Sequence, residues 1–228
     1  MIQWSNDPIV RCFWARTSES PEVIAERSTA FVDSFAEQWG PYPWSVANGP
    51  RWQGTTEELA DLVRARASTA ARGTPDPDDG YALPLTSRQP DIFGGLGVHA
   101  GTNVISRRLP THHADLTLTS TSSDSAVPVE LGDAAVRSLV TAFDPLMVSL
   151  TTGELNGLAR RGGWKIPPAY RLWLHNDVGP IHHLFDGVTA TPLGNGTLLT
   201  VPDDWPPEPV IEAILNTLTY NNLDEIPH

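Results

Sequence analysis

The sequence has a single cysteine, Cys12, and no long apolar run. One cysteine excludes a disulfide within the chain, which fits a protein of the reducing cytosol. No apolar stretch approaches the ~18 residues that a membrane-spanning helix needs, so we expect no such helix. The first residues, MIQWSNDPIVRC, lack the basic and apolar regions of a secretory signal, so we predict a cytoplasmic location.

Basic residues are scarce relative to acidic ones. Lysine and arginine total 15 against 27 aspartates and glutamates, which gives a formal net charge of −12 and a pI near 4.8. Direct binding to nucleic acid or to an anionic membrane requires clustered positive charge, so we expect neither partner. An acidic chain is instead suited to solubility and to the capture of cationic partners.

The composition is that of a globular protein, with 40% hydrophobic and 18% charged residues. The length of 228 residues suffices for one large domain or two small ones. We predict a single domain over residues 1–228. Residues 73–80, GTPDPDDG, are its candidate internal boundary, because their prolines prevent regular structure and their aspartates favour exposure.

Residues 20–40, SPEVIAERSTAFVDSFAEQWG, carry the most complete helix signal in the chain. Ser20 suits the N-cap, Pro21 suits the first helical position, and Gly40 ends the helix. Apolar side chains recur along one face with a 3.6-residue period, which predicts that they lie in the core. This face comprises Ile24, Phe31, Phe35 and Trp39.

The opposite face of this predicted helix is acidic. It carries carboxylates with i, i+4, i+11 and i+15 spacing, on Glu22, Glu26, Asp33 and Glu37. Like charges four residues apart destabilise a helix by about 0.2–0.5 kcal/mol per pair, so helix stability does not explain this face. It is either an ordinary solvated face or a docking surface for a basic partner.

The remaining pattern indicates an α+β fold, with a largely antiparallel β-sheet packed by about four helices. Helices are expected over residues 20–40, 55–72, 133–143 and 207–218, the second with a capping box at Thr55 and the third capped by Asp133. Residues 154–161 are ambiguous. Strands are expected within residues 9–15, 92–105, 116–119, 127–131, 146–150, 169–174 and 193–201.

Two histidine pairs are the candidates for a metal site, His112-His113 and His182-His183, and an aspartate follows each pair closely. Adjacent side chains on an extended segment point to opposite faces, so each pair offers one ligand per face. The i, i+4 spacing of H-E-x-x-H is absent. We therefore expect no metal and no cofactor. A metal-dependent enzyme that uses these histidines is the alternative function.

Other motifs give no positive case for catalysis. Residues 95–101, GLGVHAG, have G-x-G-x-x-x-G spacing with no helix expected after them, so we interpret them as a bulged strand or hairpin and not as a nucleotide loop. Neither G-x-x-x-x-G-K-[ST] nor G-x-S-x-G occurs. Cys12 has apolar flanks and is expected to be a buried, unreactive thiol. The expectation is a protein that is not an enzyme.

The segments FWARTSES and PEVIAERSTAFVDSFAEQW resemble the opening of the immunity protein 52 family of bacterial polymorphic toxin systems. The resemblance implies an α+β cytoplasmic protein that has no activity of its own and neutralises a cognate toxin, often a nuclease with a restriction-endonuclease-like fold. A family of binding proteins has no catalytic residues to carry over. A structural interaction module without a toxin partner is a further alternative.

The acidic composition agrees with such a role, because a nuclease presents a basic surface to DNA. We predict that the partner is a basic protein toxin and that exposed aromatic side chains, such as Trp44 or Trp52, anchor the contact. The predicted partner-binding residues form three acidic clusters: Glu22, Glu26, Asp33 and Glu37; Asp76, Asp78 and Asp79; and Asp203, Asp204 and Glu208.

Overall fold

The computed structural model describes residues 4, 8–41, 43–68, 77–122 and 126–228. Within these residues the helices and strands follow one another in an α+β order. They are β1 (Ile9–Trp14), α1 (Pro21–Trp39), β2 (Trp44–Val46), α2 (Thr56–Arg64), the short 3₁₀ helix η1 (Pro77–Asp79), β3 (Tyr81–Arg88), β4 (Ile92–Ala100), β5 (His112–Ser120), α3 (Val129–Phe143), β6 (Met147–Thr151), α4 (Gly153–Ala159), β7 (Arg171–His175), β8 (Thr189–Leu193), β9 (Gly196–Thr200) and α5 (Pro207–Tyr220).

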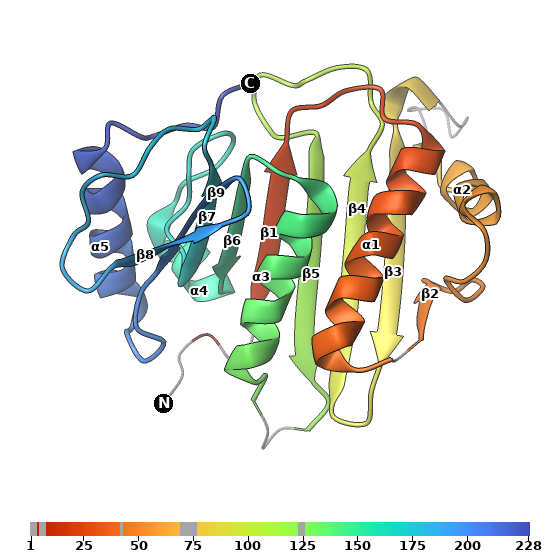
Figure 1. Cartoon of the computed structure of the whole chain (residues 1–228), viewed down its shortest axis with the longest axis horizontal. Coiled ribbons are helices and arrows are strands. Elements are labelled where there is room, and N and C mark those ends of the chain that lie inside the picture. The colour runs from red at the N-terminus through yellow and green to blue at the C-terminus, as the bar shows by residue number, and fades with distance from the viewer. Residues whose placement is uncertain (1–3, 5–7, 42, 69–76, 123–125) are drawn as a thin grey trace.

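The strands form one sheet in the order β2-β3-β4-β5-β1-β6-β7-β9-β8, and every neighbouring pair is antiparallel (Figure 1). β1 lies in the middle, where Cys12 is opposite Ala114 of β5 and Val148 of β6. β2 lies before the candidate internal boundary at residues 73–80 and β3 lies after it, yet the two strands pair with each other. The α+β class and the antiparallel sheet expected from the sequence are confirmed.

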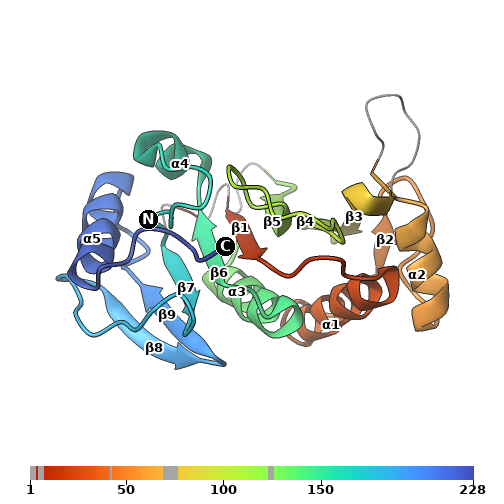
Figure 2. The same cartoon turned by 90° about the horizontal axis from the view of Figure 1, so that it is seen from above.

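The two faces of the sheet are covered unequally (Figure 2). α1 and α3 pack against each other on one face, whereas α4 and α5 lie on the opposite face near the β6–β8 end. All five residues of β6 are buried, as expected for a strand covered on both faces. In β5 only one side is buried, so that Leu116 is inaccessible while Thr117 and Thr119 are exposed. We call the helix-free side of β3, β4, β5 and β1 the open face.

The core under α1 is an aromatic cluster. Phe31 and Phe35 are fully buried and stack with ring centroids 5.4 Å apart, and Trp39 packs 4.8 Å from Phe35. Ile24 is also buried, so the predicted core face of α1 is confirmed. Ser20 accepts a hydrogen bond from the Val23 backbone N–H, as an N-cap residue should.

Two predicted boundaries are wrong. The helix predicted over residues 55–72 begins as expected, with the capping box of Thr55 in place, but α2 ends at Arg64; residues 69–72 of the prediction lie outside the described residues. The chain then pairs with β3, because the Arg66 carbonyl accepts from the Ala82 backbone N–H at 3.0 Å. This pairing supplies backbone hydrogen bonds that a longer helix would have provided internally.

The strand predicted over residues 127–131 is wrong from Val129 onwards, because α3 begins there. Asp133 is therefore inside the helix and does not cap it. Its carboxylate instead accepts a hydrogen bond from Arg171 of β7 at 2.7 Å. Gly132 packs so closely on Trp4 that an added Cβ would lie 2.6 Å from the indole ring. This contact joins the first turn of α3 to the core.

The glycine-rich stretch contains neither a bulge nor a hairpin of its own. β4 pairs in continuous register with β3 and β5. Gly94 faces α1, where an added Cβ would lie 2.6 Å from the Trp39 ring, and Gly101 ends the segment with φ +89°. Close approach of an indole explains Gly94, and left-handed backbone explains Gly101.

No helix in the described part of the chain combines the length and apolarity needed to cross a membrane.

Candidate functional site

Three carboxylates of the α1 stripe are presented to solvent. Glu26, Asp33 and Glu37 are exposed, and none forms an ion pair or a side-chain hydrogen bond with another described residue. They occupy the side of α1 that points away from the sheet. Their charges are therefore available to a partner and are not neutralised within the described structure.

The fourth member of the stripe has a structural role. Glu22 is half-buried and forms an ion pair with Arg64 of α2, which also binds Asp61 at 2.6 Å. A hydrogen bond from Ser20, together with the nearby Arg64, holds the pKa of Glu22 below its usual value. Glu22 thus joins α1 to α2.

The second acidic cluster lies at the same end of the sheet as the start of α1. η1 and the segment leading into α1 both hydrogen bond to residues 102–103, through the Asp78 carbonyl at 3.3 Å and the Ser18 N–H at 2.9 Å. Asp78 and Asp79 are exposed. Asp76 lies outside the described residues. η1 and the start of α1 thus lie at the same end of the sheet (Figure 1), whereas Asp33 and Glu37 lie about three turns or more further along α1.

The third acidic cluster lies at the opposite end of the sheet, beside the start of α5 (Figure 1). Asp203 accepts a hydrogen bond from Trp4 Nε1 at 2.7 Å and forms an ion pair with Arg171 at 2.8 Å, so its carboxylate holds these residues together. Asp204 and Glu208 are exposed. The structure does not bring the three clusters together on one surface.

The expectation of exposed tryptophan anchors is wrong. Trp44 is 2% exposed and packs edge-on against Phe31, and Trp52 is 7% exposed and donates to Thr29 Oγ1 at 3.2 Å. β2 places Trp44 in the core because it pairs with β3, a contact that spans about forty residues of sequence. The large apolar side chains that are exposed lie elsewhere, at Val104, Leu109, Leu158, Leu184 and Tyr220.

The first histidine pair is split between the two faces of β5, as predicted. His112 is fully buried, stacks on Trp14, and places Nε2 3.2 Å from the Thr102 carbonyl oxygen. His113 lies on the open face and stacks on His99, with ring centroids 4.5 Å apart. Burial lowers the pKa of both His112 and His113, because a charged imidazole loses hydration there.

The side chains of the second histidine pair are exposed, and its backbone N–H groups contact the rest of the fold. The His182 and His183 N–H groups donate to Asn221 Oδ1 at 2.7 and 3.0 Å. Among the described residues, no three His, Cys, Asp or Glu side chains come close enough together to hold a metal ion. Cys12 is buried, and burial raises the pKa of its thiol, so the group is an unreactive part of the core.

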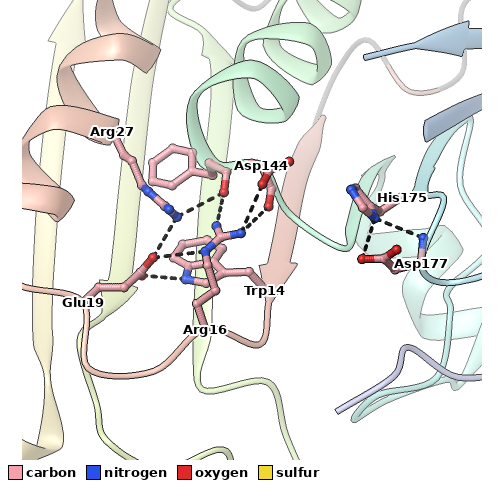
Figure 3. A network of polar contacts seen from close by, with 8 residues as sticks. Trp14, Arg16, Glu19, Arg27, Asp144, His175 and Asp177 are labelled. Atoms are coloured by element: carbon pink, nitrogen blue, oxygen red, sulfur yellow. Dashed lines mark hydrogen bonds and ion pairs between the residues drawn. The ribbon is translucent and has the colours of Figure 1, made fainter. Parts of the chain in front are cut away.

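Glu19 is a polar centre that the sequence patterns do not reveal. This buried carboxylate accepts from Trp14 Nε1 at 2.7 Å and forms ion pairs with Arg27 at 2.7 Å and Arg16 at 3.3 Å (Figure 3). Both arginines also donate to the Phe143 carbonyl at the end of α3. The network joins β1, α1 and α3, and its cations complement the negative end of the α3 dipole.

A cavity lies on the open face, away from the three acidic clusters. It has a volume of about 390 Å³ and runs along β1 between β5 and the segment that follows α4. Its walls include Arg11 of β1, Arg161, and Lys165, which is the only lysine of the chain. No sequence motif indicates this cavity, because its lining residues come from six separate segments.

No protein-family model matches the chain, and no curated protein matches it. Among solved structures, the Pseudomonas aeruginosa T6SS protein PA0821 is similar in fold, with a TM-score of 0.51. The similarity covers 94% of this chain and 76% of that one, at 10% sequence identity. At this identity the likeness concerns the fold alone.

Proposed function

We propose that this chain is an immunity protein, a cytoplasmic binder that neutralises a basic protein toxin and has no enzymatic activity of its own. The observation that supports this proposal most strongly is the exposed acidic stripe of Glu26, Asp33 and Glu37, which no described residue neutralises. The resemblance of the first forty residues to the immunity protein 52 family supports the proposal, as does the fold shared with a T6SS protein.

The docking surface we favour is the side of α1 that points away from the sheet. It offers Glu26, Asp33 and Glu37, which are all exposed. Complementary potentials accelerate protein association and suppress wrong partners. An inhibitor of a nuclease gains from fast capture, because it has to bind the toxin before the toxin reaches DNA.

The chemistry of the candidate catalytic residues agrees with a binding role. His112 and Cys12 are in the core, and His182 and His183 extend from a loop without a third ligand among the described residues. A metal-dependent enzyme built on these histidines is therefore less well supported than a binder.

The product of the adjacent gene is the test partner. We expect it to co-purify with this chain as a stoichiometric complex and to be toxic to cells only when this chain is not co-expressed. The proposal fails if the two proteins do not associate, or if co-expression gives no protection although both are soluble and folded.

A further inference from the structure

The cavity on the open face has the size of a small-molecule site. Its volume of about 390 Å³ falls in the range of roughly 300–1,000 Å³ that is typical of ligand pockets. The segment that follows α4 lines it, and α4 lies on the opposite face of the sheet from α1 (Figure 2), so the cavity is separate from the acidic stripe.

The charged side chains that line the cavity are basic. They are Arg11, Arg161 and Lys165, and none of the described lining residues carries a carboxylate. In the whole chain acidic residues outnumber basic ones by 27 to 15. Because the charged groups that border the cavity are guanidinium and ammonium donors, the cavity favours a ligand with an anionic group.

The three cations are each held by carboxylates that lie outside the cavity lining, and Arg11 pairs with Asp115 of β5. Asp224 pairs with both Arg161 and Lys165, and Glu225 pairs with Lys165 at 2.7 Å. Hydrogen bonds from Lys165 and Arg161 hold the pKa of Asp224 below its usual value, so this support persists at mildly acidic pH. Side chains fixed in this way lose little conformational entropy when a ligand binds.

One of these cations has an unused donor. Arg161 Nε is buried and has no hydrogen-bond partner among the described residues, although the Nη2 group donates to the Asp224 carbonyl at 3.0 Å. Buried donors in native proteins nearly always have a partner, so the Arg161 guanidinium keeps hydrogen-bonding capacity that the described residues do not use. A carboxylate or phosphate oxygen suits it, because guanidinium donors match oxyanion geometry.

The other part of the cavity is apolar. Phe13 and Ile9 of β1 line it together with Leu109, whose side chain is 62% exposed. An exposed leucine beside an open aromatic ring offers surface to the apolar body of a ligand.

We propose that this cavity binds a small organic anion, whose carboxylate or phosphate group contacts Arg161 and Lys165 and whose apolar body packs against Phe13 and Leu109. This site goes beyond the proposed function and does not depend on it, because toxin binding is assigned to the other face.

Calorimetric titration with phenyl phosphate and phenylacetate tests the proposal and distinguishes phosphate from carboxylate recognition. We expect saturable one-to-one binding of at least one of them. Inorganic phosphate and benzyl alcohol, which carry only one half of the ligand each, should bind about tenfold more weakly or less. The proposal is overturned if neither aromatic anion binds, or if benzyl alcohol binds equally well.

Matched variants locate the binding. Arg161→Gln and Lys165→Gln should each weaken the affinity by about tenfold or more, the scale of one lost charged hydrogen bond. Arg160→Gln removes the same charge from the neighbouring residue, which is exposed and does not line the cavity, and should leave the affinity unchanged. Equal effects of the three substitutions would contradict the site.

A measurement on the unchanged protein guards against variants that fail to fold. Because Lys165 is the only lysine, acetylation of its amine can be followed on one peptide by mass spectrometry. The aromatic anion that binds should slow this reaction in proportion to occupancy. Acetylation at an unchanged rate under saturating anion would overturn the proposal.

Discussion

His112 shows how a single core residue makes stability depend on pH. Its side chain is inaccessible and stacks on Trp14. Burial lowers the pKa of His112, while the hydrogen bond to the Thr102 carbonyl and the charge of Glu19 act in the opposite direction without cancelling the effect. The folded protein therefore keeps this imidazole neutral at pH values where the unfolded chain binds a proton.

The sign of the resulting prediction follows from proton binding. As the pH falls below the ordinary histidine pKa of about 6.5, the unfolded state takes up the proton first, so the free energy of unfolding decreases. We expect His112→Gln, which keeps a donor for Thr102 and cannot be charged, to reduce this loss between pH 7 and pH 5. One histidine contributes a slope of at most about 1.4 kcal/mol per pH unit.

Urea unfolding followed by tryptophan fluorescence at several pH values measures the effect. His182→Gln, which removes a histidine from an exposed position, is the matched control. His113 has its pKa lowered by burial in the same way, so part of the slope should remain in His112→Gln. A slope identical to wild type in that variant would contradict the prediction.

At the scale of elements, the glycines of β4 report which side of the sheet is packed. An added Cβ at Gly94 would lie 2.6 Å from the Trp39 ring, whereas one at Gly97 would meet nothing within 4 Å. We expect Gly94→Ala to lower the free energy of unfolding by about 1–3 kcal/mol through overpacking. Gly97→Ala, in the same strand, should change it by less than ~0.5 kcal/mol.

Chemical denaturation of the two variants is the measurement. The pair is matched in residue type and strand and differs in the face of the sheet, so the contrast isolates packing from β-propensity. A large loss of stability in Gly97→Ala would mean that the open face is covered, and would also remove the basis for a ligand site there.

The elements that can be predicted from the sequence are those with local signals. Ser20, Pro21 and Gly40 mark both ends of α1 within the chain segment itself, and the period of Phe31 and Phe35 identifies its buried face. The end of α2 and the start of α3 are not predictable in this way. They depend on pairing with β3 and on packing against Trp4, contacts made by distant residues.

The candidate sites also divide into features with local sequence signals and features that depend on contacts between distant residues. That Glu26, Asp33 and Glu37 share an exposed side of α1 can be predicted from spacing alone. The burial of Trp44 cannot, because it depends on a strand pair that forms only in the folded chain. The cavity is the extreme case, since it requires Arg11 and Lys165 to meet from positions more than 150 residues apart in the sequence.

At the scale of the whole molecule, the charge is distributed unevenly over the two faces. The α1 side presents unpaired carboxylates, and the open face contains a cavity lined by cations. Exposed charges on the two faces of the sheet act nearly independently, because salt screens such charges over about 8–10 Å. A partner therefore responds to the local cluster and not only to the net charge of −12.

The last prediction uses two triple variants to separate the effect of the local acidic cluster from the effect of the net charge. Glu26→Lys, Asp33→Lys and Glu37→Lys reverse the α1 stripe, and the control variant reverses three exposed acids at the α5 end, Asp204, Glu208 and Glu212. Both variants change the net charge by the same amount. We expect the stripe variant to associate with the toxin at least about tenfold more slowly and with a flatter salt dependence, because steering charges act on the association rate.

Association rates at low and high salt, from stopped-flow fluorescence, give the comparison. The association rate of the α5 variant should fall much less, since α5 lies far from α1, the proposed docking surface (Figure 1). Equal slowing in both variants would show that only net charge matters. If the α5 variant were the slower one, docking would belong to the opposite end of the sheet, and wild-type rates in both variants would rule out electrostatic capture.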